Sequence, residues 1–257
     1  MRALVTGGTR GAGLEMVKRF SQLQIPTIFT GRKDSEIKTI ESEIPQTKGF
    51  ALDLANPSTV NQLTDEIKTN HPDVNILIHN AGYLSTHHKE SLDHLQKLFM
   101  VNTISPIRIT QELLPNLLSQ KEGHVVFFSP PYRIDEKVRY LTPYMQSKLA
   151  QTTYMKSLSY LLNDKPISVN SIWTYFPLWT DAIRLRGVGR REQCMHPSIM
   201  ASMIEQIIHV ENPITFKGHE LIDKHYLPEK NINLSTFQLG AELEPLDSLF
   251  LKRLKKS

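Results

Sequence analysis

The chain has 257 residues, of which 40% are hydrophobic and 22% charged, and its formal net charge is +4. This length and composition are typical of one globular domain with a large buried core, and we expect a single domain over residues 1–257. The scattered charges give no case for nucleic-acid binding, and no stretch reaches the roughly 18 apolar residues of a membrane span.

The single cysteine, Cys194, excludes an internal disulfide and fits a reducing compartment. A strand is expected at the very start of the chain, which leaves no room for a signal peptide. We therefore expect a cytoplasmic protein. Because no His or Cys cluster has the spacing of metal ligands, we expect no metal site.

Apolar runs and amphipathic segments alternate along the chain. The expected strands are Ala3–Thr6, Thr27–Thr30, Gly49–Leu52, Asn75–His79, Val125–Phe128, Ser168–Trp173 and one near His219–Asp223. The expected helices are Leu14–Leu23, Ser35–Glu43, Ser58–Lys68, Leu92–Leu118, Pro143–Leu162 and one from about Pro197 to Val210. This alternation predicts an α/β fold with a doubly wound parallel sheet in three layers, α/β/α. Ligands bind such a sheet at the carboxyl ends of its strands.

A glycine-rich turn follows the first strand, with glycines at positions 7, 11 and 13. Such a turn directs backbone N–H groups at an anion in front of a helix, and a dinucleotide pyrophosphate is its usual occupant. The spacing differs from G-x-G-x-x-G, and a tight connection without a ligand is the alternative. The candidate cofactor residues here are Gly7, Thr9, Arg10, Gly11, Ala12 and Gly13.

The second strand ends in Gly31-Arg32-Lys33, where sites specific for NAD carry an acidic residue. A guanidinium binds a phosphate dianion through parallel charged hydrogen bonds. We therefore expect NADP(H) to be preferred, with NAD(H) as the second choice. In the alternative, Arg32 and Lys33 only begin an exposed helix and Asp34 binds the ribose.

Two further strand ends carry polar or small residues. Asp53 and Leu54 close the third strand, and Asp53 could accept a hydrogen bond from an adenine amine. Asn80, Ala81 and Gly82 close the fourth, where small residues let the backbone approach a ribose. Together with the glycine turn, these positions predict one site at the edge of the sheet.

Tyr144 and Lys148 stand four residues apart at the start of an expected helix and project from one face of it. An ammonium near a phenol lowers the pKa of the phenol, which can then exchange a proton with a substrate oxygen. Tyr226 and Lys230 have the same spacing, but Pro228 between them argues against a continuous helix.

In order and spacing, these motifs resemble the short-chain dehydrogenase/reductase family over nearly the whole chain. The resemblance implies a Rossmann-like fold and hydride transfer between a nicotinamide cofactor and a carbonyl or alcohol. It also implies that Tyr144 is the acid/base, that Lys148 holds the nicotinamide ribose, and that Asn102, in a helix break, anchors a water in the proton relay. Thr180 after the sixth strand completes the match, and a homodimer or homotetramer is expected.

The departure from the family is its catalytic serine, because our alignment places Pro130 at that position. Ser129 is one residue early, and we retain it as a catalytic candidate if the Pro130-Pro131 pair redirects the chain. The stretch Ser129-Pro130-Pro131 is similar to the hydroxysteroid-dehydrogenase-like branch, as are Ile172-Trp173, the lengthened stretch to Thr180, Pro197–Ala201 and Leu221–Asp223.

Residues 174–200 are expected to form a substrate lid, and a C-terminal tail begins at about residue 227. Apolar residues available to the cleft are Trp173, Tyr175, Phe176, Leu178, Trp179 and Met195. Cys194 and His196 are expected to pack in the lid and not to form a nucleophile–base pair. The sequence thus predicts an NADP(H)-dependent oxidoreductase for an apolar, lipid-like substrate. The competing hypothesis is an NADP(H)-binding sensor or interaction protein with weak or no turnover.

Overall fold

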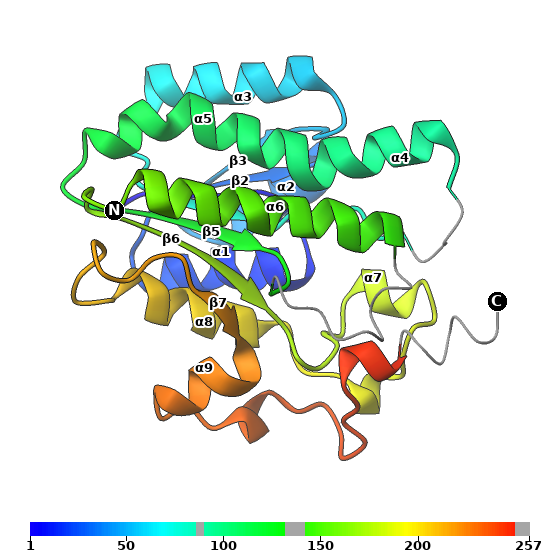
Figure 1. The fold of residues 1–257 in the computed structure, drawn as a ribbon. Coiled ribbons are helices and arrows are strands. Elements are labelled where there is room, and N and C mark those ends of the chain that lie inside the picture. Colours follow the sequence, from blue (N-terminus) through cyan, green and yellow to red (C-terminus); the bar gives the residue numbers. More distant parts are fainter. Residues whose placement is uncertain (86–89, 132–141, 250–257) are drawn as a thin grey trace.

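The computed structural model describes residues 1–85, 90–131 and 142–249 of the chain. Seven parallel strands form one sheet in the order β3-β2-β1-β4-β5-β6-β7 (Figure 1). They are β1 (Ala3–Val5), β2 (Thr27–Gly31), β3 (Thr47–Ala51), β4 (Ile76–His79), β5 (Gly123–Phe128), β6 (Ile167–Trp173) and β7 (Glu220–Ile222). Each lies within two residues of its predicted ends, and the doubly wound parallel sheet is confirmed.

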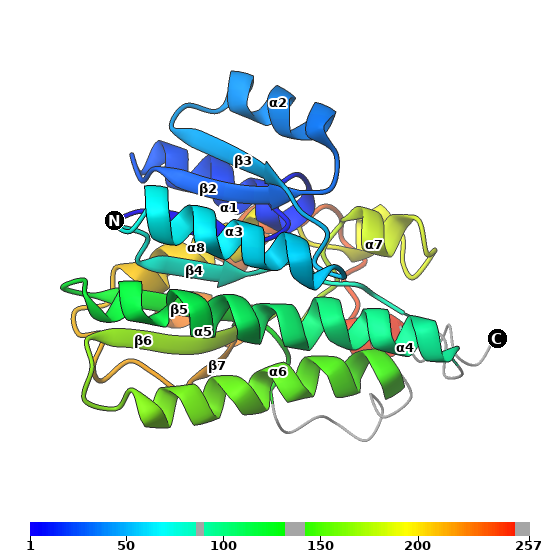
Figure 2. The same ribbon diagram turned by 90° about the horizontal axis from the view of Figure 1, so that it is seen from above.

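Helices cover both faces of this sheet. They are α1 (Gly11–Gln22), α2 (Asp34–Glu43), α3 (Pro57–Asn70), α4 (Leu92–Phe99), α5 (Ser105–Leu118), α6 (Thr142–Leu161), α7 (Asp181–Arg184), α8 (Ser198–Ile208) and α9 (Asp223–Glu229). Figures 1 and 2 show α3, α5 and α6 over one face and α1 and α8 over the other. Within the described residues, no helix is both long enough and apolar enough to cross a bilayer.

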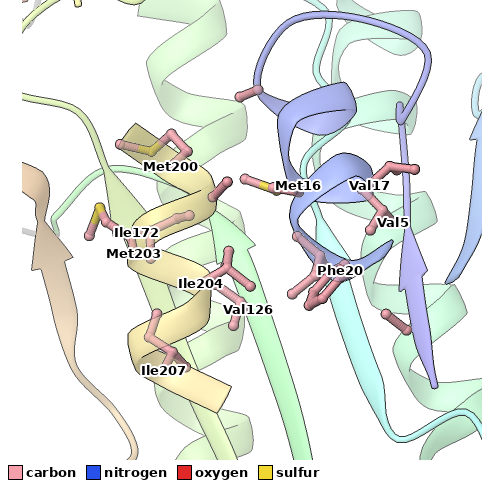
Figure 3. Close-up of a cluster of buried hydrophobic side chains, with 14 of the residues drawn as sticks. Val5, Met16, Val17, Phe20, Val126, Ile172, Met200, Met203, Ile204 and Ile207 are labelled. Atoms are coloured by element: carbon pink, nitrogen blue, oxygen red, sulfur yellow. The ribbon is translucent and has the colours of Figure 1, made fainter. Parts of the chain in front are cut away.

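The core between α1, α8 and the sheet fixes the start of α1. Met16 and Phe20 of α1 and Met203 of α8 are buried together with Val126 and Ile172 of β5 and β6 (Figure 3). Each such side chain contributes about 1.5–3 kcal/mol on burial. This packing holds the helix N-terminus at the carboxyl end of β1, where the glycine turn lies.

Two helical expectations need correction. The single helix predicted over Leu92–Leu118 is α4 and α5 separated by a π-helical turn, η1 (Met100–Ile104). The segment at Pro228 is helical, because α9 contains this proline. Proline has no N–H to donate, so one helical hydrogen bond is lost, and α9 ends at the next residue.

Candidate active site

The glycine turn has a backbone that side chains would disrupt. Gly7 and Gly11 have φ values of +69° and +56°, which L-residues with a Cβ rarely adopt. A Cβ on Gly13 would lie 2.1 Å from the carbonyl oxygen of Gly7. The three predicted glycines therefore let α1 start directly against β1, which turns the helix N-terminus toward the space beyond the sheet.

Strands on both sides of β1 hold this turn in place. The Asn80 Nδ2 group donates to the carbonyl oxygens of Thr6 and Gly7, at 3.0 and 3.1 Å. On the other side, the Gly7 N–H donates to Thr30 Oγ1 at 3.1 Å. The Ala81 N–H donates to Thr6 Oγ1. The Asn80 side chain thus shapes the turn, a positioning role that its place in the motif did not reveal.

A cavity of about 670 Å³ lies at the carboxyl ends of the strands, within the size range of small-molecule sites. It collects predicted residues from distant parts of the chain. Those that line it are Gly7, Thr9, Arg10, Gly11, Ala12, Arg32, Asp53, Leu54, Asn80, Ala81, Gly82, Tyr144, Lys148 and Thr180. Gly13, Asn102 and Ser129 do not line it.

The cations at the glycine end of the cavity have different surroundings. Arg10 lies 3.5 Å from Asp181 of α7, which also pairs with Arg184 at 2.7 Å. Lys33 pairs with Glu36. Arg32 is exposed and, among the described residues, has no ion pair or hydrogen bond. Its guanidinium is therefore free to meet an anion at the end of β2.

Lys148 is buried in α6, and its Nζ donates to the Phe128 carbonyl at 2.8 Å. Burial lowers the pKa of this ammonium to about 7. Burial also raises the pKa of Tyr144 above its usual value. The pKa of Tyr144 is therefore raised in the structure, and not lowered by Lys148 as expected. Here desolvation of the phenol dominates, and the ammonium is engaged with the end of β5.

Asn102 lies in the π-helical turn η1, so the predicted helix break is confirmed. Its fully buried side chain accepts the Tyr83 N–H at 2.7 Å and donates to the Tyr83 carbonyl and to Ser147 Oγ, both at 3.0 Å. Ser147 Oγ in turn donates to the Tyr144 carbonyl at 2.7 Å. Asn102 thus joins the loop after β4 to the first turn of α6, which carries Tyr144.

Ser129 is fully buried, and its Oγ accepts a hydrogen bond from Thr152 Oγ1 at 2.9 Å. Thr152 also donates to the Pro130 carbonyl at 2.7 Å. Phe128 faces the cavity, so its neighbour in the chain points the other way, as alternation in a strand requires. The expectation that Ser129 meets a substrate oxygen is therefore corrected. The structure does not bring it together with Tyr144.

The predicted apolar residues of the lid divide into two groups. Trp173 and Leu178 line the cavity, whereas Tyr175, Phe176, Trp179 and Met195 do not. Cys194 is buried, its Sγ donates to the Arg190 carbonyl, and burial raises the pKa of the thiol to about 11. His196 bonds to Ser198. Cys194 thus packs in this segment as predicted, whereas His196 is exposed, so the prediction that it packs there is wrong.

Several lining residues escaped the sequence reasoning: Leu84, Lys97, Asp181, Ile183, Arg186 and Leu246. A basic run at 184–191 was visible in the sequence, but nothing local indicated which of its members faces the cavity. Leu246 lies in the C-terminal segment, and no pattern near it indicates contact with a site built around β1. Tyr226, from the second Tyr/Lys pair, is buried outside the cavity.

Comparison with known proteins gives a family match over most of the chain. The model of a family described as short chain dehydrogenase matches residues 1–183. A fatty acyl-CoA reductase of Acinetobacter baylyi is 26% identical over 265 residues, covering 99% of this chain and 88% of that protein. An NADP-dependent 3-hydroxy acid dehydrogenase of Salmonella typhi, YdfG, is 27% identical, and this chain spans about half of its length (52%).

Solved structures share the fold. A short chain dehydrogenase of Mycobacterium thermoresistibile has a TM-score of 0.84 and 20% identity, with 95% of this chain and 93% of that chain covered. A short chain dehydrogenase of Burkholderia cenocepacia in complex with NADP has a TM-score of 0.71 and 23% identity, with 86% and 95% covered.

Proposed function

The chain belongs to the short-chain dehydrogenase family, and on this premise we propose that it is an oxidoreductase with NADP(H) as its preferred cofactor. In this proposal, it transfers a hydride between the nicotinamide and the carbonyl or alcohol carbon of an apolar, lipid-like substrate. The names of its relatives, a fatty acyl-CoA reductase and an NADP-dependent 3-hydroxy acid dehydrogenase, support this reaction class.

The residues present fit a dinucleotide. The glycine turn offers backbone N–H groups at a helix N-terminus, and a Cβ at position 13 would collide with the turn. Arg10 would face the phosphates, Arg32 a 2′-phosphate, and Asp53 the adenine. Lys148 would bind the nicotinamide ribose and Thr180 the nicotinamide. When bound, the cofactor supplies or accepts the hydride.

Tyr144 is the proposed acid/base. In the reducing direction its hydroxyl gives a proton to the substrate oxygen as the carbonyl carbon gains a hydride, so that the products are an alcohol and a phenolate. Burial keeps this phenol protonated but, by raising its pKa, also makes it a weaker acid, so donation requires stabilisation of the phenolate. Lys148, beside the same cavity, would lower the cost of the phenolate, and Asn102 holds this turn of α6 through Ser147.

The observation that carries the proposal is the placement of Tyr144 and Lys148 in the same cavity as the glycine turn. The test is NADPH-dependent turnover of aldehydes and ketones by the wild-type protein and by Tyr144→Phe. We expect the variant to lose about 10²–10⁴-fold in kcat.

The matched control is Ser129→Ala, which also removes one hydroxyl but at a position outside the cavity. We expect its kcat to stay within about twofold of wild type, because Ser129 is buried outside the cavity and, within the described residues, its hydroxyl bonds to Thr152 alone. Equal rates in Tyr144→Phe and wild type would refute the role of the phenol. A large loss in Ser129→Ala would restore the serine to the catalytic set.

The second candidate is an NADP(H)-binding sensor or interaction protein with weak or no turnover. The observation in its favour is that Ser129 points away from the cavity, so the family serine has no replacement among the residues that we place at the substrate oxygen. NADPH binding without turnover of any aldehyde or ketone would select this candidate.

Further features of the proposal follow the family. Exposed apolar side chains on α5 and α6, among them Leu118, Tyr160 and Leu161, support a homodimer or homotetramer through these helices. The single buried cysteine supports a cytoplasmic location. The segment Ser129-Pro130-Pro131 after β5 supports the hydroxysteroid-dehydrogenase-like branch. We also propose that residues 174–200 act as a lid and that the tail from about 227 packs on it, which the bond from the Leu239 N–H to the Cys194 carbonyl supports.

A further inference from the structure

The part of the cavity beside Tyr144 has an apolar wall assembled from four separate segments. Leu84 follows β4, Trp173 ends β6, Ile183 belongs to α7 and Leu246 to the C-terminal segment. All four pack in one hydrophobic cluster with Tyr144. A substrate whose reacting carbon reaches the phenol must therefore lay an apolar body against this wall.

The C-terminal part of the wall is held firmly. We call residues 234–249 the strap. The Leu246 N–H donates to the Tyr175 carbonyl at 2.9 Å, and the Leu239 N–H donates to the Cys194 carbonyl at 3.2 Å. A Cβ on Gly240 would lie 2.6 Å from Glu192 Cα, so the strap lies directly on the lid. The wall is thus a fixed surface of the cavity.

Positive charge exceeds negative charge along the cavity. Its basic lining residues are Arg10, Arg32, Lys97, Lys148 and Arg186, whereas its acidic ones are Asp53 and Asp181. Arg10 is paired with Asp181, Lys148 donates to Phe128 and Gln151, and Lys97 lies over the Tyr83 ring. Arg32, at the end of β2, is accounted for by the 2′-phosphate.

Arg186 is the basic lining residue to which the proposed function assigns no role. It is partly buried, lines the cavity and, among the described residues, makes no ion pair or hydrogen bond. A guanidinium keeps its charge at any physiological pH and offers a fork of N–H donors that matches carboxylate and phosphate oxygens. A partly desolvated, unpaired one is poised to bind an oxyanion.

The lid places Arg186 toward the substrate end. The segment begins at the glycine turn, where Asp181 meets Arg10, and then runs to the apolar cluster, which contains Ile183 and Val188. Arg186 lies between these two clustered residues in the sequence. In Figures 1 and 2, α7 lies beyond the carboxyl ends of the strands. Asp181 and Ile183 of this helix line the cavity.

We propose that the substrate is an amphiphile, with a carbonyl or alcohol at Tyr144, an apolar chain against the wall and a carboxylate or phosphate group on Arg186. This rests on the proposed function for the reacting end, but the anion site follows from the cavity itself. Arg186 sets specificity and does not take part in hydride or proton transfer.

The test compares ω-oxo fatty acids of several chain lengths with their methyl esters, in which an uncharged ester replaces the carboxylate. We expect the wild type to favour the acids, and Arg186→Gln to lower kcat/KM for the acids roughly ten- to hundredfold, the range of a charge-assisted hydrogen bond. Turnover of the esters should be unchanged. The matched control, Arg191→Gln, removes an exposed lid cation that does not line the cavity and should behave as wild type.

Two results would overturn the assignment. Equal use of acids and esters by the wild type would exclude an anion site. A weaker NADPH affinity in Arg186→Gln, with equal losses for acids and esters, would mean that the guanidinium serves a cofactor phosphate. An ω-oxoalkyl phosphate series distinguishes the two anions, and the better substrate class identifies the head group.

Failure of the proposed function has a different signature, namely no turnover of any carbonyl by the wild type. In that case, ligand binding tests the anion site at Arg186 without any turnover. We expect dodecanoate, but not dodecanol, to raise the melting temperature of the wild-type protein in the presence of NADP⁺, and Arg186→Gln to abolish that rise. Equal stabilisation of both proteins by dodecanoate would refute the anion site.

Discussion

Replacing Gly13 with alanine tests whether close packing of α1 on the glycine turn creates the cofactor site. The new Cβ would lie 2.1 Å from the Gly7 carbonyl oxygen and 2.5 Å from Asn80 Nδ2. The first neighbour is backbone, so the helix and the turn must move apart. Such overpacking costs typically 1–3 kcal/mol, and loss of the two Asn80 hydrogen bonds adds about 0.5–1.5 kcal/mol each. We expect a total of about 2–6 kcal/mol.

The assay is urea unfolding of Gly13→Ala, with NADPH affinity measured by fluorescence on the folded protein. We expect a lower free energy of unfolding and at least tenfold weaker NADPH binding, because the N–H groups of the turn lose their common direction. Gly82→Ala is the control for stability, since its Cβ would meet Lys148 Nζ at an ordinary 3.5 Å. Wild-type stability and NADPH affinity in Gly13→Ala would refute the packing argument.

Two further predictions concern charge. Arg32→Asp should weaken NADPH binding roughly ten- to hundredfold and improve NADH binding, because a carboxylate repels a 2′-phosphate and accepts hydrogen bonds from ribose hydroxyls. The control is Lys33→Gln. Unchanged NADPH affinity in Arg32→Asp would contradict the assignment. Burial lowers the pKa of His79 to about 3. Below pH 6.5 the imidazole therefore binds a proton in the unfolded chain but not in the folded protein, which favours unfolding. Stability from this residue is complete above pH 6.5 and declines toward pH 3, by about 2 kcal/mol at pH 5. Urea unfolding at pH 7 and pH 5 checks this, and an equal decline in His79→Gln would exclude His79 as the cause.

The cofactor half of the site could be predicted because its signals are local. Glycines in a turn, a cation at a strand end and a Tyr–Lys pair on one helix face each follow from short-range geometry. A parallel sheet then brings strand ends together along one edge. The positions of Arg32, Asp53 and Tyr144 in one cavity follow from these two rules.

Other properties depend on contacts that the sequence does not display. The raised pKa of Tyr144 follows from burial by segments distant in the chain, and the partner of Lys148 is a backbone carbonyl. Strand alternation did indicate that Ser129 faces away from the cavity. Only the structure, however, shows that Thr152 binds its hydroxyl on the far side. Leu246 lines the cavity, and its N–H donates to the carbonyl of Tyr175, which lies far earlier in the chain. No periodicity in the sequence indicates such a pairing.

The strap lies outside the part of the chain that the family model matches. The family description matches residues 1–183, which hold the cofactor cradle, Tyr144 and Lys148. Arg186 and Leu246, which we assign to the substrate, lie beyond that match. Under this assignment, mutations after residue 183 can change the substrate while leaving the proposed cofactor site untouched. Substrate preference could thus change during evolution while Tyr144 and Lys148 stay the same.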